Sequence, residues 1–391
     1  MLTLRRRALH FVVLMGIVSL FADMVYEGGR SISGPYMALL GASGTVVGLM
    51  AGVGELIAYG LRIVFGYLSD HTRRYWAFTI AGYGLTALAV PALALAGSWQ
   101  IAVLLLTLER VSKALRSPAK DTLLAYATKT IGHGKGFGLH EALDQIGAVA
   151  APLLLAAVLA WQGSYELAFA LLLIPGGLSI LALLVARARF PQPEDLAGTT
   201  PALKPQGFER TFWLYLIAVG LIAAGFADFP LIAFHLQRTE LVASALIPVL
   251  YALAMAVDAG AALLFGLLFD QIGYKALTLA ALLSLGFAPM VFSSSLALVV
   301  LGMVLWGIGL GAQESILRAA VATMVPAERR GTAYGLFNAS YGMAWFLGSA
   351  ILGLLYDRAL PMMIAVSVGL QVVALGLLIV VMRWQHHERI A

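Results

Sequence analysis

The chain has 391 residues, of which 61% are hydrophobic and only 12% are charged, with a net charge of +5 and no cysteine. A soluble domain carries about 25% charged residues, so this composition excludes an ordinary water-soluble protein. The missing cysteines exclude disulfides and thiolate chemistry. The basic residues are spread among short loops instead of forming one patch, so we expect a lipid bilayer and no nucleic acid as partner.

Apolar runs of about 20 residues recur along the whole length, which is typical of membrane-spanning helices. We predict an all-α membrane protein with twelve transmembrane helices. The expected spans are residues 9–39, 45–67, 76–97, 100–125, 137–160, 166–188, 211–236, 244–268, 275–294, 297–323, 332–356 and 361–383.

Lysine and arginine fall mainly in the loops on one side of this expected topology, whereas the opposite loops carry little beyond Arg238 and Arg358. Cytoplasmic loops of membrane proteins are enriched in these two residue types. The even number of spans then predicts that both termini are cytoplasmic. The basic residues on that side are Arg5 to Arg7, Arg73, Arg74, Lys129, Lys135, Arg187, Arg189, Lys204, Arg210, Lys275, Arg329, Arg330, Arg383 and Arg389.

The chain is predicted to contain two six-helix halves. Residues 189–210 form the longest hydrophilic stretch and are rich in proline, which indicates a cytoplasmic linker between residues 1–188 and residues 211–391. The sequence Phe-Ala-Asp at residues 21–23 recurs at residues 226–228, and FGYLSD at residues 65–70 recurs as FGLLFD at residues 265–270. Two recurrences in register, at matching places in the span order, indicate structural repeats.

The chain resembles the major facilitator superfamily of secondary transporters over essentially its whole length. The family's loop signature is matched after the second span by Gly66, Leu68, Asp70, Arg73 and Arg74, and after the eighth span by Gly266, Leu268, Asp270, Gly273 and Lys275. In the first copy, Arg73 stands where the family usually has glycine. The resemblance implies that Asp70 with Arg73 or Arg74, and Asp270 with Lys275, act as conformational latches. It also implies that Arg110 in the fourth span takes part in proton coupling.

Ionisable residues inside the apolar spans are the candidates for a functional site, because such groups are costly in a membrane unless they face a wet cavity or a protein interior. Asp23, Glu27 and Arg30 are spaced to share one face of the first span. We expect Asp23 to line the central cavity, with Arg110 as its preferred partner. The candidates for proton coupling or the cavity are Asp23, Glu27, Arg30, Glu55, Arg110, Lys113, Asp144, Asp228, Asp258 and Glu314.

The sequence therefore predicts a monomeric secondary transporter that moves a small solute by alternating access, driven by protons, in a bacterial inner membrane. Efflux and uptake by symport stay open at this stage, as does the charge of the solute. A membrane-embedded enzyme that uses the buried charges as acids and bases is the alternative from another class. Because the sequence shows no metal-ligand cluster, nucleophile motif or suitably placed carboxylate pair, we expect no enzyme activity, no metal and no cofactor.

Overall fold

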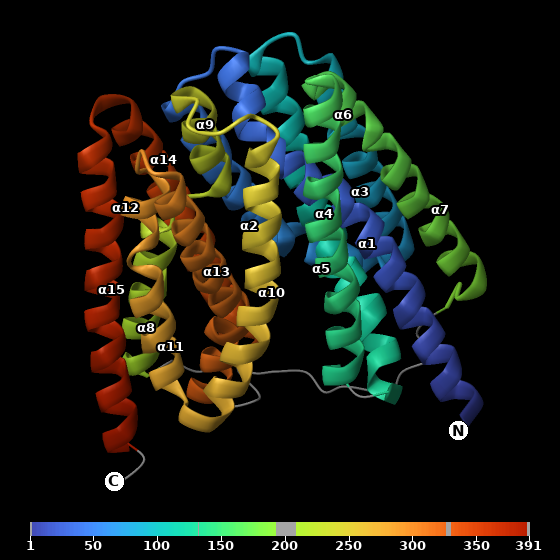
Figure 1. Ribbon diagram of the computed structural model, residues 1–391. Coiled ribbons are helices and arrows are strands. Elements are labelled where there is room, and N and C mark those ends of the chain that lie inside the picture. Colours follow the sequence, from blue (N-terminus) through green and yellow to red (C-terminus); the bar gives the residue numbers. More distant parts are fainter. Residues whose placement is uncertain (1, 132, 193–208, 326–329, 389–391) are drawn as a thin grey trace. The chain divides into compact units, whose positions relative to one another are not determined.

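The computed structural model describes residues 2–131, 133–192, 209–325 and 330–388 (Figure 1). All regular secondary structure in these residues is helical. The first six expected spans correspond to α1 (Leu2–Leu39), α2 (Gly44–Thr72), α3 (Tyr75–Ala89) with the 3-10 helix η1 (Pro91–Leu95), α4 (Trp99–Ile131), α5 (His133–Gln162), and α6 (Tyr165–Leu171) with α7 (Leu173–Arg189).

The remaining six expected spans are also helical. They correspond to α8 (Arg210–Gly225) with α9 (Phe229–Thr239), α10 (Leu246–Ile272), α11 (Tyr274–Ser284) with α12 (Phe287–Val291), α13 (Leu296–Met324), α14 (Arg330–Arg358) and α15 (Leu360–Glu388). Each expected span thus overlaps one helix or two consecutive helices, which confirms the all-α class.

Eleven segments of the described chain are long and apolar enough to cross a membrane, by length and composition. The fourth expected span, α4, is not among them, although its 33 residues would extend about 50 Å at the helical rise. Its charged residues, which include Glu109, Arg110, Lys113 and Arg116, make it less apolar than the others. The twelfth span and the cytoplasmic location of the termini stay predictions.

Four expected spans are interrupted, and a proline lies in the first turn after each interruption. Pro91 begins η1, Pro175 lies near the start of α7, Pro230 near the start of α9 and Pro289 near the start of α12. Proline suits these positions because its ring matches the helical φ, and because the first turn of a helix needs no N–H donor.

At the interruption between α8 and α9, the carbonyl groups of Gly225 and Ala227 accept hydrogen bonds from side chains of other helices. The Ser367 hydroxyl donates to the Gly225 oxygen at 2.6 Å, and the Trp306 indole N–H donates to the Ala227 oxygen at 2.9 Å. A backbone group without a partner in hydrocarbon would cost several kcal/mol. These side-chain donors replace the helical hydrogen bonds that the break removes. At the end of the break, Asp228 caps α9 by accepting from the backbone N–H of Phe229 at 2.9 Å.

The described residues fall into two compact units. Of these residues, the first unit comprises 2–41, 57–131, 133–192 and 244–252, and the second comprises 42–56, 209–243, 253–325 and 330–388. The start of α2 therefore packs in the second unit, and the start of α10 packs in the first. The expected division into halves stays a prediction, and residues 193–208 of the expected linker lie outside the described residues.

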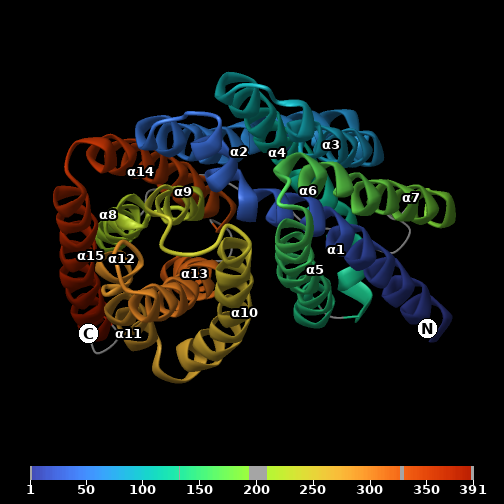
Figure 2. The ribbon, with the colours of Figure 1, turned by 45° about the horizontal axis from the view of Figure 1, so that its top comes forward.

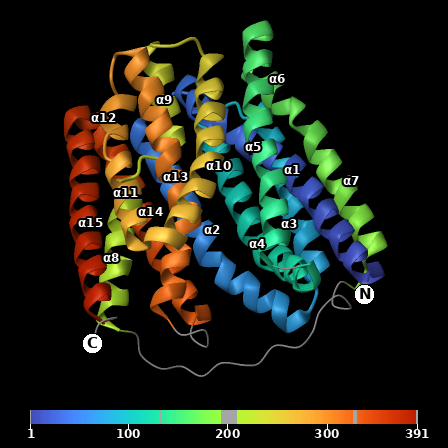
Figure 3. The same ribbon diagram turned by 60° about the horizontal axis from the view of Figure 1, so that its bottom comes forward.

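In the first unit, α1 packs against α5, α7 and α4, and α3 packs against α4 and α7 (Figure 2). The contact between α1 and α5 is close because Gly147 on α5 has no side chain, and a Cβ there would overlap the Leu20 carbonyl oxygen. In the second unit, α8 packs against α15 and α14, and α13 packs against α11 and α12 (Figure 3).

Asp357, near the end of α14, caps the start of α2 within the second unit. Its carboxylate accepts hydrogen bonds from the backbone N–H groups of Gly44 at 2.9 Å and Thr45 at 2.6 Å, and from the Thr45 hydroxyl at 2.6 Å. Arg238 lies 3.7 Å from the same carboxylate. The first N–H groups of a helix have no partner in the helix itself. Ser43 Oγ accepts from the Val46 N–H at 3.2 Å, and Asp357 supplies acceptors from another helix for the N–H groups of Gly44 and Thr45.

We expect Asp357→Ala to destabilise the protein by about 1 to 2 kcal/mol, the usual cost of a lost N-cap. Thermal unfolding of the purified protein in detergent, followed by tryptophan fluorescence, measures this change. Arg358→Ala is the matched control, because it removes the exposed neighbouring side chain and leaves the cap in place. Equal melting temperatures for the two variants would contradict the capping role.

Candidate functional site

Two polar contacts join α1 to α5 inside the first unit, one helical turn apart. Ser19 Oγ lies 2.8 Å from His140 Nε2. Four residues further along each helix, the carboxyl groups of Asp23 and Asp144 lie close enough to interact. Two ionised carboxylates repel each other at such close range, and a proton on one of them removes the repulsion. The pair can therefore hold a proton within the bundle.

The positive charge of Arg116 on α4 acts on Asp23, and that of Lys120 acts on Asp144. The Arg116 guanidinium group donates to Thr86 Oγ1 at 2.6 Å, and its Cζ lies 4.7 Å from the centroid of the Tyr83 ring. Both contacts hold the buried Arg116 side chain in place. A fixed positive charge beside the pair can balance the negative charge that appears when the pair releases its proton.

A second cluster surrounds the ring of Tyr26 on α1. The guanidinium group of Arg110 donates to the Tyr26 hydroxyl, and Lys113 Nζ lies 4.1 Å from the ring centroid. Arg110 Nε also lies 3.5 Å from the carboxylate of the buried Glu109. The contacts described for Arg110 are therefore with Tyr26 and Glu109, whereas those described for Asp23 involve α5 and Arg116.

Glu27 and Arg30 continue the polar face of α1. The hydroxyl group of Tyr251, on the part of α10 that belongs to the first unit, donates to the Glu27 carboxylate. Arg30 Nη1 lies 3.9 Å from the same carboxylate. Although Gly28 and Gly29 lie between these two residues, α1 continues through them to Leu39.

The other four candidates belong to the second unit. Asp228 was expected inside a seventh helix, but it lies in the interruption after α8 and caps α9. Asp258 on α10 is buried against α13, where Gly311 leaves room for it. Glu55 on α2 is partly buried, and Glu314 on α13 is exposed. The structure therefore gathers Asp23, Glu27, Arg30, Arg110, Lys113 and Asp144 on α1, α4 and α5 of the first unit.

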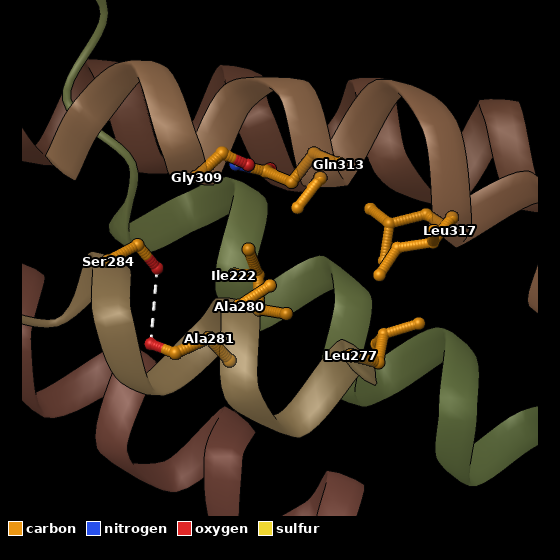
Figure 4. A pocket seen from close by; sticks show the side chains of 10 residues that line it. Ile222, Leu277, Ala280, Ala281, Ser284, Gly309, Gln313 and Leu317 are labelled. Atoms are coloured by element: carbon orange, nitrogen blue, oxygen red, sulfur yellow. Dashed lines mark hydrogen bonds between the residues drawn. The ribbon is translucent and has the colours of Figure 1, made fainter. Parts of the chain in front are cut away.

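A small pocket in the second unit lies between α8, α11 and α13 (Figure 4). Its polar groups are already engaged: the Ser284 hydroxyl donates to the Ala281 oxygen at 3.1 Å, and Gln313 donates to the Gly309 oxygen at 3.1 Å and accepts from Tyr341 at 3.0 Å. No charged residue lines it, so we do not assign it to the site. Its lining comprises Ile222, Leu277, Ala280, Ala281, Ser284, Gly309, Ala312, Gln313, Ile316 and Leu317.

Comparison with known proteins identifies the family. The family model of the Major Facilitator Superfamily matches residues 14–349 and, in a second match, residues 229–389. The chain belongs to the Major Facilitator Superfamily. The family expected from the sequence is confirmed, and this protein is an integral, multi-pass membrane transporter.

Relatives in the superfamily show how far the similarity extends. An uncharacterized protein of Mycobacterium tuberculosis is 44% identical over 375 residues, which cover 94% of this chain and 92% of that protein. An uncharacterized MFS-type transporter of Methanocaldococcus jannaschii is 28% identical over 360 residues, which cover 88% of each chain.

Solved structures of transporters share the fold. The nucleoside transporter NupG superposes with a TM-score of 0.74 at 15% identity, over 95% of this chain and 99% of that one. A bacterial homolog of the human lysosomal transporter Spinster, in an inward-facing and occupied conformation, gives a TM-score of 0.75 at 16% identity over 96% of each chain. At these identities the likeness shows the fold alone.

The two loop signatures of the superfamily each place a residue with positive φ at the equivalent position. Arg73 between α2 and α3 has φ of 51°, and Gly273 between α10 and α11 has φ of 58°. Arginine thus has a positive φ where the second copy has glycine. Asp70 accepts a hydrogen bond from the Tyr75 hydroxyl at 3.1 Å. In the described residues, Asp70 forms no ion pair with Arg73 or Arg74.

The remaining latch candidates lie at the ends of the same helices. Gly66 on α2 packs against Pro118 of α4, whereas Gly266 on α10 faces open space. Asp270 and Lys275 are exposed. The latch role of all eight residues stays a prediction.

Replacing Arg73 by glycine removes the positive charge of the side chain but keeps a residue that tolerates the positive φ of the turn. We expect Arg73→Gly to change the free energy of unfolding by less than about 1 kcal/mol, because relief of the left-handed strain offsets the greater freedom of the unfolded chain. Arg73→Val should cost about 1 to 2 kcal/mol, since a β-branched residue is strained at positive φ. Thermal unfolding in detergent measures both values, and equal stability of the two variants would contradict the turn geometry.

The sequence indicated Asp23 and Asp144 separately but missed three residues that contact the site: Ser19, Tyr83 and Tyr251. Serine and tyrosine are common in apolar helices, so neither residue type stands out. The available signal was spacing, because Ser19 lies one turn before Asp23 as His140 lies one turn before Asp144.

Proposed function

We propose that this protein is a proton-coupled secondary transporter that moves a small solute by alternating access. The observation that carries the proposal is the juxtaposition of Asp23 and Asp144 across the close contact between α1 and α5, where two neighbouring carboxyl groups can share a proton. The superfamily membership supports transport, and the fold neighbours are transporters. Membership in a family of transporters also argues against the alternative that the protein is a membrane-embedded enzyme.

The contacts of Glu27 suggest how the proton and the helices are linked. Glu27 lies one turn beyond Asp23 on α1, and its negative charge acts on the pair. The Tyr251 hydroxyl joins Glu27 to α10. A movement of α10 that withdrew Tyr251 would change the charge and hydrogen bonding of Glu27, and with it the affinity of the pair for a proton.

The test is a solute screen in proteoliposomes under an imposed pH gradient, with solute flux and proton flux both measured. Arg110 and Lys113 place two cations beside the Tyr26 ring, so the screen begins with anionic aromatic solutes. Protons moving with the solute indicate uptake by symport, and protons moving against it indicate efflux. Solute movement that is insensitive to the gradient would contradict proton coupling, and a chemically altered solute would contradict transport.

We further propose that the protein acts as a monomer in a bacterial inner membrane. The mycobacterial relative supports a bacterial setting. Light scattering of the purified protein in detergent, corrected for the bound detergent, gives the molecular mass of the particle. A mass well above the 41.5 kDa of one chain would contradict the monomer.

A further inference from the structure

A row of buried polar side chains crosses the first unit from α3 through α1 to α5. The Tyr83 hydroxyl lies 3.2 Å from Ser19 Oγ, and Ser19 Oγ lies 2.8 Å from His140 Nε2. All three side chains are buried. A hydroxyl group can donate one hydrogen bond while it accepts another, and a neutral imidazole can do the same with its two nitrogens. The row is therefore a continuous path of exchangeable protons.

The inner end of this row lies beside the carboxyl pair. His140 lies one turn before Asp144 on α5, and the negative charge of Asp144 acts on its ring. On α1, Ser19 likewise lies one turn before Asp23. The Ser19–His140 contact and the Asp23–Asp144 contact thus both join α1 to α5, one helical turn apart.

The outer end of the row leads to the surface of α4. The Lys120 side chain lies close enough to both Tyr83 and His140 for their charges to interact. Lys120 Nζ is 3.8 Å from an Asp121 carboxylate oxygen. The Asp121 side chain is 60% exposed and the Lys120 side chain 19%, so the path opens to water at this ion pair.

From this geometry we propose that Tyr83, Ser19 and His140 form a proton relay between the surface at Asp121 and the Asp23–Asp144 pair. The relay rests on the proposed function and adds a route for the proton within the first unit. A proton reaches the Tyr83 oxygen as the Tyr83 hydrogen passes to Ser19 Oγ. The Ser19 hydrogen passes to His140 Nε2, and the proton on the other ring nitrogen passes to the carboxylate of the pair.

The charges around the relay come from three helices. Asp23 and Glu27 lie on α1, Arg116 and Lys120 on α4, and Asp144 on α5. Arg116 lies against the Tyr83 ring and also acts on Asp23, and Lys120 acts on Tyr83, His140 and Asp144. The cations therefore accompany the whole row, and the negative charge of the ionised pair attracts a proton at its inner end.

The experiment measures how fast the carboxyl pair takes up a proton. Purified full-length protein in detergent is mixed rapidly from alkaline into acidic buffer, and infrared absorption follows the protonated carboxyl groups. The part of the signal that is lost in Asp23→Asn and in Asp144→Asn belongs to the pair. We expect Ser19→Ala, Tyr83→Phe and His140→Ala each to slow this part on the order of tenfold or more, with the final amplitude unchanged. Added imidazole should restore the rate of His140→Ala.

Two matched controls separate a relay from the loss of any buried hydrogen bond. Ser179 is buried and donates to the Val18 carbonyl at 3.0 Å, so Ser179→Ala removes a comparable bond to α1 outside the row. His235 is buried and lies 3.0 Å from the Tyr356 hydroxyl, so His235→Ala removes a comparable histidine in the second unit. Both variants should keep the rate of the unmodified protein.

The outcomes distinguish the relay from the function on which it rests. Relay variants that protonate the pair at the unmodified rate would overturn the relay and leave the proposed function intact. Absence of the pair's infrared signal in the unmodified protein would overturn the pair as proton carrier, and the relay with it. If His140→Ala does not fold, the two smaller changes at Ser19 and Tyr83 decide the question.

Discussion

Asp23→Asn is expected to abolish solute accumulation driven by a pH gradient, while exchange of solute across the membrane continues. An amide has its own N–H donors, so it can pair with the ionised Asp144 carboxylate without a shared proton, and the pair no longer takes up and releases one. The change keeps the size of the side chain. The measurement is gradient-driven uptake or efflux in proteoliposomes, beside counterflow without a gradient, for the solute that the screen identifies.

Because the two carboxyl groups act as one site, Asp144→Asn should have the same effect, and the double variant should be no worse than either single one. Glu166→Gln is the matched control, since Glu166 is an exposed carboxylate on α6. Full gradient-driven accumulation by Asp23→Asn would remove the pair from the coupling mechanism. Additive losses in the double variant would show that the two groups act independently.

The positions of the helices could be predicted from the sequence, but the interruptions could not. Apolar runs indicate where a span lies. They do not reveal the break within the seventh span, where α8 ends at Gly225 and α9 begins at Phe229. The break depends on partners from distant helices, such as Trp306 and Ser367, for its carbonyl groups. Such partners are a property of the packed bundle, so the placement of Asp228 within a continuous helix was wrong.

The members of the candidate site could be predicted better than their pairing. A buried charge is visible in an apolar sequence, and this identified Asp23, Arg110 and Asp144. The partner of each charge depends on which helices are neighbours and on their register. Arg110 was expected beside Asp23; its described contacts include Tyr26 and Glu109, and the pairing with Asp23 stays a prediction.

The register of α1 against α5 is set by small residues whose role the sequence alone does not reveal. Gly16 on α1 lies against the Leu143 side chain, and Gly147 on α5 lies against the backbone of Leu20. These contacts let the two helices approach closely enough for Asp23 and Asp144 to meet. Packing of small residues is the usual basis for close helix contact in membranes.

Gly147→Ala therefore tests both the stability of the first unit and the geometry of the carboxyl pair. The new Cβ would overlap the Leu20 carbonyl oxygen, and because the obstacle is backbone, α5 must move away from α1. We expect a loss of about 2 to 3 kcal/mol, typical of an overpacked contact, seen as a lower melting temperature in detergent. The displacement also separates Asp144 from Asp23, so gradient-driven accumulation should fall more than exchange.

Gly177→Ala on α7 is the control, because we expect it to raise the stability of the protein where Gly147→Ala lowers it. No atom lies within 4 Å of the place where its Cβ would stand, so the change should stabilise the helix by up to about 1 kcal/mol through the higher helix propensity of alanine. If the two variants melt at the same temperature, the close contact at Gly147 does not hold α1 and α5 together. If Gly147→Ala loses stability but keeps full coupling, the Asp23–Asp144 pair tolerates separation, and the shared proton is not the source of coupling.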